Sequence, residues 1–466
     1  MTRQPVKFID LFAGTGGIRL AFEQALADLG CSGDCVKSVE IDPFACRTYE
    51  LNFGESPFGD VRKLTDIERF DVLLAGFPCQ AFSYAGKQRG FADTRGTLFF
   101  EVERLLGKYR PKLAFLENVR GLTTHDGGKT FQTILERLSN LGYEVEYRLV
   151  NASSLGVPQN RTRIYIVASL GRHPQIRLQS DLGASDSHAY KTIQPSLFSE
   201  KRIYRRVRDI LEDEPSDEYD CSSAFREKVA NALGGDLGRI HGVRLIDTRH
   251  GNSIHSWDIG RKGDCSEREK SFMNLFVSNR RRHVFGTQQD GKALTREQIS
   301  TFYEADDRDD LIASLLQKGY LKEDSEHRIN LVCGNMSFEC FKFLDPDSIS
   351  ITLTASDANR LGVFHRDRLR HITPRECARL QGYPDSYILH PDDKYAYKQM
   401  GNAVCVPVIK EIFSDLLSHT DGLLHDISQT TFRRGIEQRK AYKNTEGRVS
   451  LRTSPVRFGK AQPLLV

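Results

Sequence analysis

Hydrophobic and polar positions in the first 170 residues follow two periods in turn. Short apolar or alternating runs are typical of strands, and most of them precede stretches in which apolar residues recur three and four positions apart, as in a helix facing a core. The predicted strands span residues 7–12, 36–42, 71–77, 113–118, 143–150 and 163–169. Because strand and helix alternate, we predict an α/β fold with a doubly wound, mostly parallel sheet.

The pattern changes after residue 172. Residues 173–345 are polar, carry acidic runs such as EDEPSDEYD, and show little alternation of strand and helix. Regular patterns return at SISITLTAS (348–356) and in helices predicted at 374–382 and 406–417. We therefore expect a sheet domain that a smaller domain interrupts. The expected divisions are 1–190 for the first part of the catalytic and cofactor-binding domain, 191–395 for the insertion and its hinge, and 396–466 for the return and a basic tail.

Composition excludes several classes of protein. A chain of 466 residues can bury a large core without disulfide bonds. Its ten cysteines form no C-x2-C pair, and the nearest group, Cys31, Cys35 and Cys46, has no matching pair of histidines, so we expect reduced thiols and no metal site. No apolar run approaches the roughly 18 residues of a membrane span, and MTRQPVKFID lacks the apolar segment of a secretory signal. We expect a cytoplasmic protein.

Charge adds little to this picture. The net charge is +4, so overall charge does not indicate a polyanionic partner. Residues 431–466 carry nine lysines and arginines against two glutamates, a local excess of seven positive charges. Such a tail can contact phosphates, but we favour a solvated end of the chain.

The first chemical motif is DLFAGTGG (10–17), placed where the first strand turns into a helix. Glycines there let the backbone approach a ligand, and Glu40 at the end of the second strand can accept hydrogen bonds from ribose hydroxyls. The turn lacks the full G-x-G-x-x-G spacing of a pyrophosphate site. The motif therefore favours S-adenosylmethionine over a nicotinamide dinucleotide.

A second motif, GFPCQAFS (76–83), follows a buried strand at the edge where α/β sheets bind ligands. Most cysteines are small buried hydrophobes, but a thiol at a strand tip can become a nucleophilic thiolate. The residues that follow, 84–100, contain several glycines and the basic residues Lys87, Arg89 and Arg95. We expect Cys79 to be that nucleophile, beside a flexible lid over a phosphate-bearing substrate.

Two further motifs flank the last strands of the sheet. ENV (117–119) ends a strand, where Glu117 can act as an acid of raised pKa or merely be solvated. In PQNRTRIYIV (158–167), Gln159, Arg161 and Arg163 alternate, so they share one face of an extended segment. Two arginines on one face at the start of a buried strand indicate a binding role rather than surface charge.

Together these blocks resemble the bacterial DNA (cytosine-5)-methyltransferase family of restriction-modification systems. The matching blocks occur in the family's order over about residues 6–170 and 348–410: FIDLFAGTGG, SVEID, GD at 59–60, GFPCQAFS, ENV, QNRTR, TPRECARLQGYPDSY and YKQMGNAV. The unmatched interval lies where the family keeps its variable target-recognition region. Ile41 stands where many members have an aromatic residue, and Ala403 where serine is common, which affects local cofactor packing only.

The resemblance implies a Rossmann-like S-adenosylmethionine-dependent methyltransferase sheet with an inserted smaller target-recognition domain. The enzyme would methylate carbon 5 of a cytosine flipped out of duplex DNA. Cys79 would add to carbon 6, Glu117 would bind the exocyclic amine and ring nitrogen 3, and Arg163 would hold the base carbonyl, with Arg161 as a fourth catalytic residue. The implied S-adenosylmethionine-binding residues are Phe12, Gly14, Gly16, Glu40, Ile41, Asp60, Val61, Pro78, Leu98 and Asn402.

The resemblance also implies contacts with double-stranded DNA and no metal. The expected DNA-binding residues are Ser83, Lys87, Arg95, Gln159, Arg280, Arg281 and Arg282. The last three come from NRRRH (279–283) in the insertion, which is either a base-reading and phosphate-binding element or an ordinary solvated loop. We expect a monomer, and leave open an associated restriction endonuclease that acts on the same site.

Three other functions compete with this one. An RNA cytosine-5 methyltransferase of the same fold shares the chemistry, but such enzymes resemble a version with a short insertion. A nicotinamide-dependent dehydrogenase shares only the sheet and gives no role to Cys79, Glu117 and Arg163 together. A silent DNA-binding protein is disfavoured because every expected catalytic position is filled.

Overall fold

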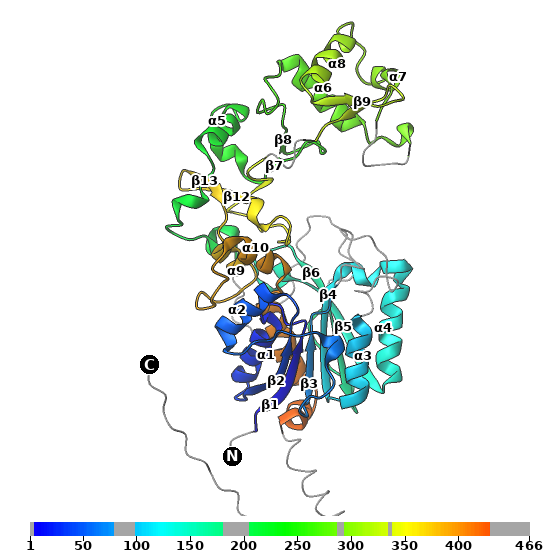
Figure 1. Ribbon diagram of the computed structural model, residues 1–466, viewed down its shortest axis with the longest axis vertical. Helices are drawn as coiled ribbons and strands as arrows, with labels where there is room; N and C mark the ends of the chain where they lie inside the picture. Colours follow the sequence, from blue (N-terminus) through cyan, green and yellow to red (C-terminus); the bar gives the residue numbers. More distant parts are fainter. Residues whose placement is uncertain (1–3, 79–97, 180–204, 287–292, 334–337, 429–466) are drawn as a thin grey trace, which may run out of the picture.

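The structure is a computed structural model that describes residues 4–78, 98–179, 205–286, 293–333 and 338–428 (Figure 1). A six-stranded sheet forms its centre, in the order β2-β1-β3-β4-β6-β5. The strands are β1 (Val6–Leu11), β2 (Gly33–Val39), β3 (Val72–Ala75), β4 (Leu113–Val119), β5 (Tyr143–Asn151) and β6 (Thr162–Leu170). The first four are parallel, and β6 runs antiparallel to both of its neighbours. The predicted α/β class and mostly parallel sheet are confirmed.

Helices cover both faces of this sheet. On one face, α1 (Gly17–Asp28) packs beside α11 (Val406–His419), near the end of the described chain. The ring of Phe413 lies 4.7 Å from that of Phe22 and 4.4 Å from that of Phe115, so α11 closes the core over the centre of the sheet. On the other face, α3 (Leu98–Tyr109) and α4 (Lys129–Asn140) bury their apolar sides against a second core.

The insertion forms a separate sheet and an outer lobe, seen at the top of Figure 1. The sheet has the order β13-β12-β11-β7-β8 and carries α5 (Ser223–Ala232). The outer lobe surrounds the fully buried Trp257. The sheet strands are β7 (Arg244–Leu245), β8 (Ser253–Ile254), β11 (Lys342–Leu344), β12 (Leu361–His365) and β13 (Arg368–His371). The lobe elements are α6 (Glu267–Asn279), α7 (Arg296–Ser300), α8 (Arg308–Gln317), β9 (Leu321–Glu323) and β10 (Ile329–Leu331).

The chain rejoins the core of the sheet domain before the predicted boundary at residue 396. Leu344, Leu353 and Leu361 already belong to the same hydrophobic cluster as α1 and α11. The helices α9 (Pro374–Leu380) and α10 (Asp393–Asn402) follow, and α2 (Pro43–Phe53) contacts α10. Residues of β11 and β12 thus pack against the core of the sheet domain although these strands belong to the inserted sheet. The domain limits stay a prediction.

The helices predicted at 374–382 and 406–417 correspond to α9 and α11. The run at 348–356, where regular structure is predicted, contains only an isolated parallel bridge between Ser350 and Gln159 and turns. In the part of the chain that the structure describes, every helix is too short or too polar to cross a bilayer.

Candidate active site

A glycine turn follows β1 at the carboxyl edge of the sheet. Phe12, Gly14 and Gly16 all have φ between 54° and 81°, the left-handed region, so the chain folds back within five residues before α1 begins at Gly17. A Cβ atom on Gly16 would lie 2.2 Å from the ring of Phe53, so the turn also needs glycine for space. This geometry leaves backbone N–H groups at the helix start, as the sequence predicts.

Glu40, just after β2, fastens this turn. Its Oε2 atom accepts a hydrogen bond from the N–H of Gly14 (2.8 Å), and its Oε1 atom accepts from the N–H groups of Ile41 and Asp42 (both 2.8 Å). The carboxylate is thereby held at one orientation between two strand ends. An acceptor fixed in this way is prepared for the hydroxyl groups of a ribose.

Apolar side chains lie exposed beside Glu40. Ile41 is 61% exposed and Phe58, which forms a bridge with Glu40, is 64% exposed. Next to them, the Arg62 guanidinium hydrogen-bonds Asp60 through two nitrogens and lowers the pKa of that carboxyl to about 2. Exposed apolar side chains beside a fixed acceptor suit the adenosine part of a cofactor.

The remaining expected cofactor residues lie at the same edge or under it. Val61 is buried in the core beneath the edge, whereas Pro78 and Leu98 stand on either side of residues 79–97 and are partly exposed. Asn402 is exposed at the end of α10. A Cβ atom on the preceding Gly401 would lie 2.3 Å from the backbone of Thr354, so this glycine brings the two segments together.

Asp10 is a buried acid that sequence reasoning did not single out. It is 1% exposed, and neither carboxyl oxygen has a hydrogen-bond partner among the described residues. Burial raises the pKa of Asp10 to about 8, against the lowering effect of Arg19. The signal was present in the sequence as the first residue of DLFAGTGG, an acid within the strand VKFIDL, which is apolar apart from Asp10 and Lys7.

Glu117 and Arg163 meet at the tips of β4 and β6. Glu117 pairs with Tyr165 in the antiparallel register, so Arg163 lies diagonally on the same face. The Nε atom of Arg163 is 3.4 Å from Oε1 of Glu117, and both side chains are largely buried (16% and 12% exposed). Burial raises the pKa of Glu117, and the nearby Arg163 and Arg161 oppose that rise. A carboxyl group in this setting retains its proton to a higher pH than usual.

Arg161 and Gln159 lie on the face that the alternation predicts, but they point into protein. Arg161 donates to the carbonyl oxygens of Leu353 (2.8 Å) and Ala403 (2.6 Å). Burial, together with the neighbouring Arg163, lowers the pKa of Arg161 to about 9. It therefore supports the loops behind the site.

Gln159 faces the interior of the protein. It is 0% exposed; its Nε2 atom donates to the carbonyl of Leu380 (2.8 Å), and its Oε1 atom accepts from the N–H of Leu353 (3.0 Å). The expectation that Gln159 contacts DNA does not fit this placement, because its polar atoms are used inside the protein. Alternation alone cannot show whether a polar face meets solvent or another segment.

Asn118 was missed within the ENV motif. Its Nδ2 atom donates to the carbonyl of Phe77 (3.2 Å), and its Oδ1 atom accepts from the N–H of Val119. Asn118 thus ties the tip of β4 to the segment that leads into residue 79. The predicted nucleophile Cys79 and the predicted DNA contacts Ser83, Lys87 and Arg95 lie outside the described residues.

The three arginines of NRRRH do not share one surface. Arg280 is 2% exposed, Arg281 is half-buried and Arg282 is exposed. Arg280 directly follows the last residue of α6 and its side chain is buried, so the predicted DNA contact does not fit its placement.

A polar cavity of about 1000 Å³ lies between α5 and α6, lined by residues that include Arg239, Lys270 and Asn274. It lies in the insertion and not at the strand tips.

The glycine turn and Glu40 form a cradle at the tips of β1 and β2, and the acid–arginine pair lies at the tips of β4 and β6. Both lie along the edge of an α/β sheet where enzymes of this class bind their ligands. The chain belongs to the C-5 cytosine-specific DNA methylase family, which it matches over residues 6–418, and its activity is DNA cytosine methylation. The resemblance found in the sequence motifs is confirmed.

The chain is similar to three bacterial enzymes over most of its length. It is 58% identical over 414 residues to the type II methyltransferase M.BanI of Aneurinibacillus aneurinilyticus, covering 89% of this chain and 96% of that protein. It is 56% identical over 418 residues to M.HgiCI of Herpetosiphon aurantiacus (89% and 99%) and 41% identical over 448 residues to M.NlaIV of Neisseria lactamica (90% and 100%). These alignments span the insertion as well as the sheet domain.

Proposed function

We propose that this enzyme methylates one cytosine within a specific site in duplex DNA, through a covalent adduct with Cys79. The observation that carries the proposal is the Glu117–Arg163 pair at the sheet edge, where a Cβ atom on Gly76, three residues before Cys79, would lie 3.9 Å from Oε2 of Glu117. The relatives' name, type II methyltransferase, supports a role in restriction-modification. Methylation would then protect host DNA from an endonuclease that cuts the same site, and a monomer would carry out the reaction.

S-Adenosylmethionine is the methyl donor that we propose for the cradle. When bound, it supplies a methyl group on a positively charged sulfur. Glu40 would accept hydrogen bonds from its ribose, and the exposed faces of Ile41 and Phe58 would cover its adenine. The unpaired carboxyl group of Asp10 suits a site that receives positive charge, since a nearby cation stabilises the carboxylate.

The chain's own residues would carry the cytosine chemistry. The Cys79 thiolate adds to carbon 6, and the electron pair of the 5,6 double bond becomes available at carbon 5 for the incoming methyl group. Protonated Glu117 donates a hydrogen bond to ring nitrogen 3 and stabilises charge that develops there, while Arg163 donates to the base carbonyl. Loss of the carbon-5 proton and departure of the thiolate then restore the aromatic ring.

Gln159 and Arg161 would act as positioning residues in this scheme. Each connects the strand that bears Arg163 to the segment at Leu353, and Arg161 also reaches Ala403, next to Asn402. They therefore join the base-binding side of the site to the cofactor side. We assign DNA contact instead to the exposed Arg282 and to residues 79–97.

A duplex that carries 5-fluorocytosine at the target tests the covalent route. Fluorine cannot leave carbon 5 as a cation, so the adduct should accumulate and survive denaturing electrophoresis. The target itself is found first by bisulfite sequencing of DNA from cells that express the enzyme. If the active enzyme forms no adduct, the covalent mechanism through Cys79 is wrong. If labelled methyl is transferred to RNA and not to DNA, the assignment of DNA as the substrate is wrong.

A further inference from the structure

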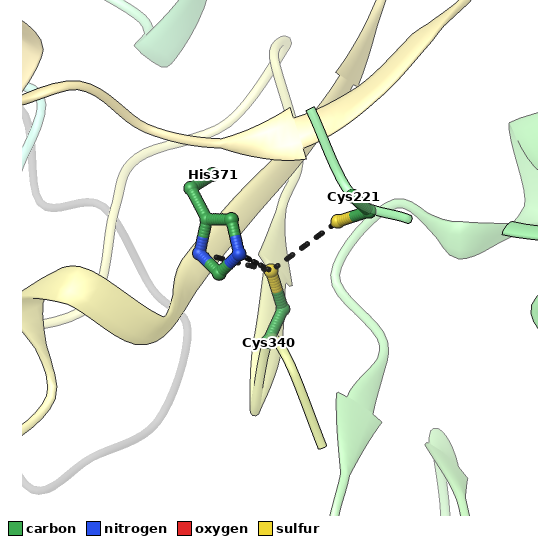
Figure 2. Close-up of side chains that lie close together, drawn as sticks. All are labelled: Cys221, Cys340 and His371. Carbon is green, nitrogen blue, oxygen red and sulfur yellow. Dashed lines mark hydrogen bonds between the residues drawn. The ribbon is translucent and has the colours of Figure 1, made fainter. Parts of the chain in front are cut away.

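Two cysteines and a histidine from distant parts of the chain meet in the inserted sheet. Cys221 precedes α5, Cys340 precedes β11, and His371 ends β13 (Figure 2). The Sγ atoms of Cys221 and Cys340 are 3.9 Å apart, and Nδ1 and Nε2 of His371 lie 3.6 and 4.0 Å from Sγ of Cys340. One ligand atom from each residue lies within 4.8 Å of the other two, and both cysteines are buried.

We propose that Cys221, Cys340 and His371 bind one structural Zn²⁺ ion, with water as the fourth ligand. Zn–S bonds of about 2.3 Å and Zn–N bonds of about 2.0–2.1 Å in a tetrahedron place the ligand atoms roughly 3.5–3.8 Å apart. The Sγ–Sγ separation of 3.9 Å and the separation of 4.0 Å between Nε2 and the Cys340 sulfur lie within about 0.5 Å of that spacing. A disulfide needs sulfurs about 2.05 Å apart. Thiolate and imidazole ligands select Zn²⁺ over Mg²⁺ or Ca²⁺.

The backbone holds the three residues in place independently of any ion. The N–H of Cys221 donates to the carbonyl of Leu369 (2.9 Å), and Asp220 forms an antiparallel bridge with Arg370, so Cys221 runs alongside β13. His371 pairs with Gly362 on β12. The ligands are therefore positioned by sheet pairing.

Gly362 keeps space for the Cys340 sulfur. A Cβ atom on Gly362 would lie 2.7 Å from Sγ of Cys340 and 2.6 Å from the ring of Phe343. Any larger residue would push the sulfur away from its partners. The strand thus carries a glycine at the position where a side chain would fill the proposed site.

The imidazole of His371 is oriented as metal-binding histidines are. Its Nδ1 atom donates to the carbonyl oxygen of Asn359 (2.9 Å), which leaves the lone pair of Nε2 for a ligand. A ring whose outer nitrogen is fixed by such a hydrogen bond is the form that coordinates Zn²⁺.

Glu339 is not counted as a ligand. Its carboxylate accepts hydrogen bonds from the N–H and the hydroxyl of Ser222 (2.9 and 2.6 Å). It thereby joins the two cysteine-bearing segments from the outside and leaves the fourth coordination position to water.

An ion at this point would join the segment that leaves the sheet domain to the strands that return to it. The surrounding core is small and has Phe225, Val229 and Phe343 among its members. Small cores gain stability from a metal because binding energy becomes folding energy. The proposal adds a structural metal to an enzyme whose proposed chemistry requires none, and it stands whether or not the covalent route is correct.

Metal analysis of the untagged full-length protein tests the proposal. Purified under reducing conditions, the wild type should contain about one Zn²⁺ per chain by mass spectrometry. Cys340→Ser and His371→Gln should each contain less than roughly a tenth of that. Cys333→Ser, which alters an exposed cysteine of the same insertion, is the matched control and should retain the full content.

Cobalt substitution keeps the test independent of activity and of variant stability. The metal-free wild type should gain a thiolate-to-cobalt absorption band with Co²⁺, and chelation should lower its Tm. Cys340→Ser should show neither change, and Cys333→Ser should show both. A folded wild type with no zinc and no cobalt band would overturn the proposal, as would a Cys221–Cys340 disulfide found by peptide mapping of the protein kept under reducing conditions.

Discussion

The sheet domain and the insertion assemble their side-chain clusters in different ways. In the sheet domain, Glu40 and Glu117 follow or end parallel strands, and β6 runs the opposite way, so its first residues, including Arg163, reach the same edge. In the insertion, short strands bring Cys221, Cys340 and His371 together from separate segments. The cluster at the strand tips follows from the topology of the sheet, so it can be predicted from a single sequence. The cysteine–histidine cluster of the insertion depends on tertiary packing, so it cannot.

Replacing the proposed nucleophile should have the largest effect. Cys79→Ser is expected to abolish methyl transfer, because a hydroxyl is a far weaker nucleophile than a thiolate at neutral pH. S-Adenosylmethionine binding, measured by calorimetry, should stay nearly unchanged. Cys333→Ser serves as the control with normal activity. Substantial methylation by the Cys79 variant would break the assignment of chemistry to the sheet edge.

Glu117→Gln should lower kcat by about 10²–10⁴-fold. Because the folded protein raises the pKa of Glu117, its protonated form persists above the ordinary carboxyl range, and the rate should fall as pH rises through that pKa. The glutamine variant should lack this limb of the pH–rate profile. Glu144→Gln, on the exposed side of β5, should keep both rate and profile. If the Glu117→Gln variant keeps the fall in rate at high pH, another group is responsible for that part of the pH–rate profile.

Gln159→Ala separates positioning from DNA contact. Losing a buried amide that bonds Leu380 and Leu353 should lower the free energy of unfolding by about 2–4 kcal/mol, measured by urea denaturation. The salt dependence of DNA binding should not change. Gln132→Ala, in an exposed position of α4, should cost less than about 0.5 kcal/mol. A shallower salt dependence with normal stability would instead restore the DNA contact predicted from sequence.

The smallest effect is expected from the exposed arginine of the insertion. If Arg282 contacts one phosphate, Arg282→Ala should weaken DNA binding uniformly across sequences and reduce the slope of log K against log salt by about 0.9. Arg280→Ala should instead lower stability, because that side chain is buried. Loss of discrimination at one base pair in the Arg282 variant would show that this residue reads a base.

Much of the catalytic half could be predicted from sequence. All six strands of the main sheet overlap their predicted ranges, although β2 begins and ends three residues earlier than predicted, and α9 and α11 lie at the two predicted helices. Glycine turns and strand-terminal acids follow from the same pattern, since parallel strands deliver their carboxyl ends to one edge. The interior role of Gln159 could not be predicted, because alternation defines a face but not what packs against it.

The α/β class, the order of the motifs and the family can be read from the sequence, because they depend on residues close together along the chain. The burial of polar residues such as Asp10, Arg161 and Arg280, and the place where the insertion rejoins the main core, depend on tertiary packing. Tertiary packing also makes Cys221, Cys340 and His371 neighbours. Their separations of 119 and 31 residues carry no periodic signal, and only the pairing of short strands closes the distance.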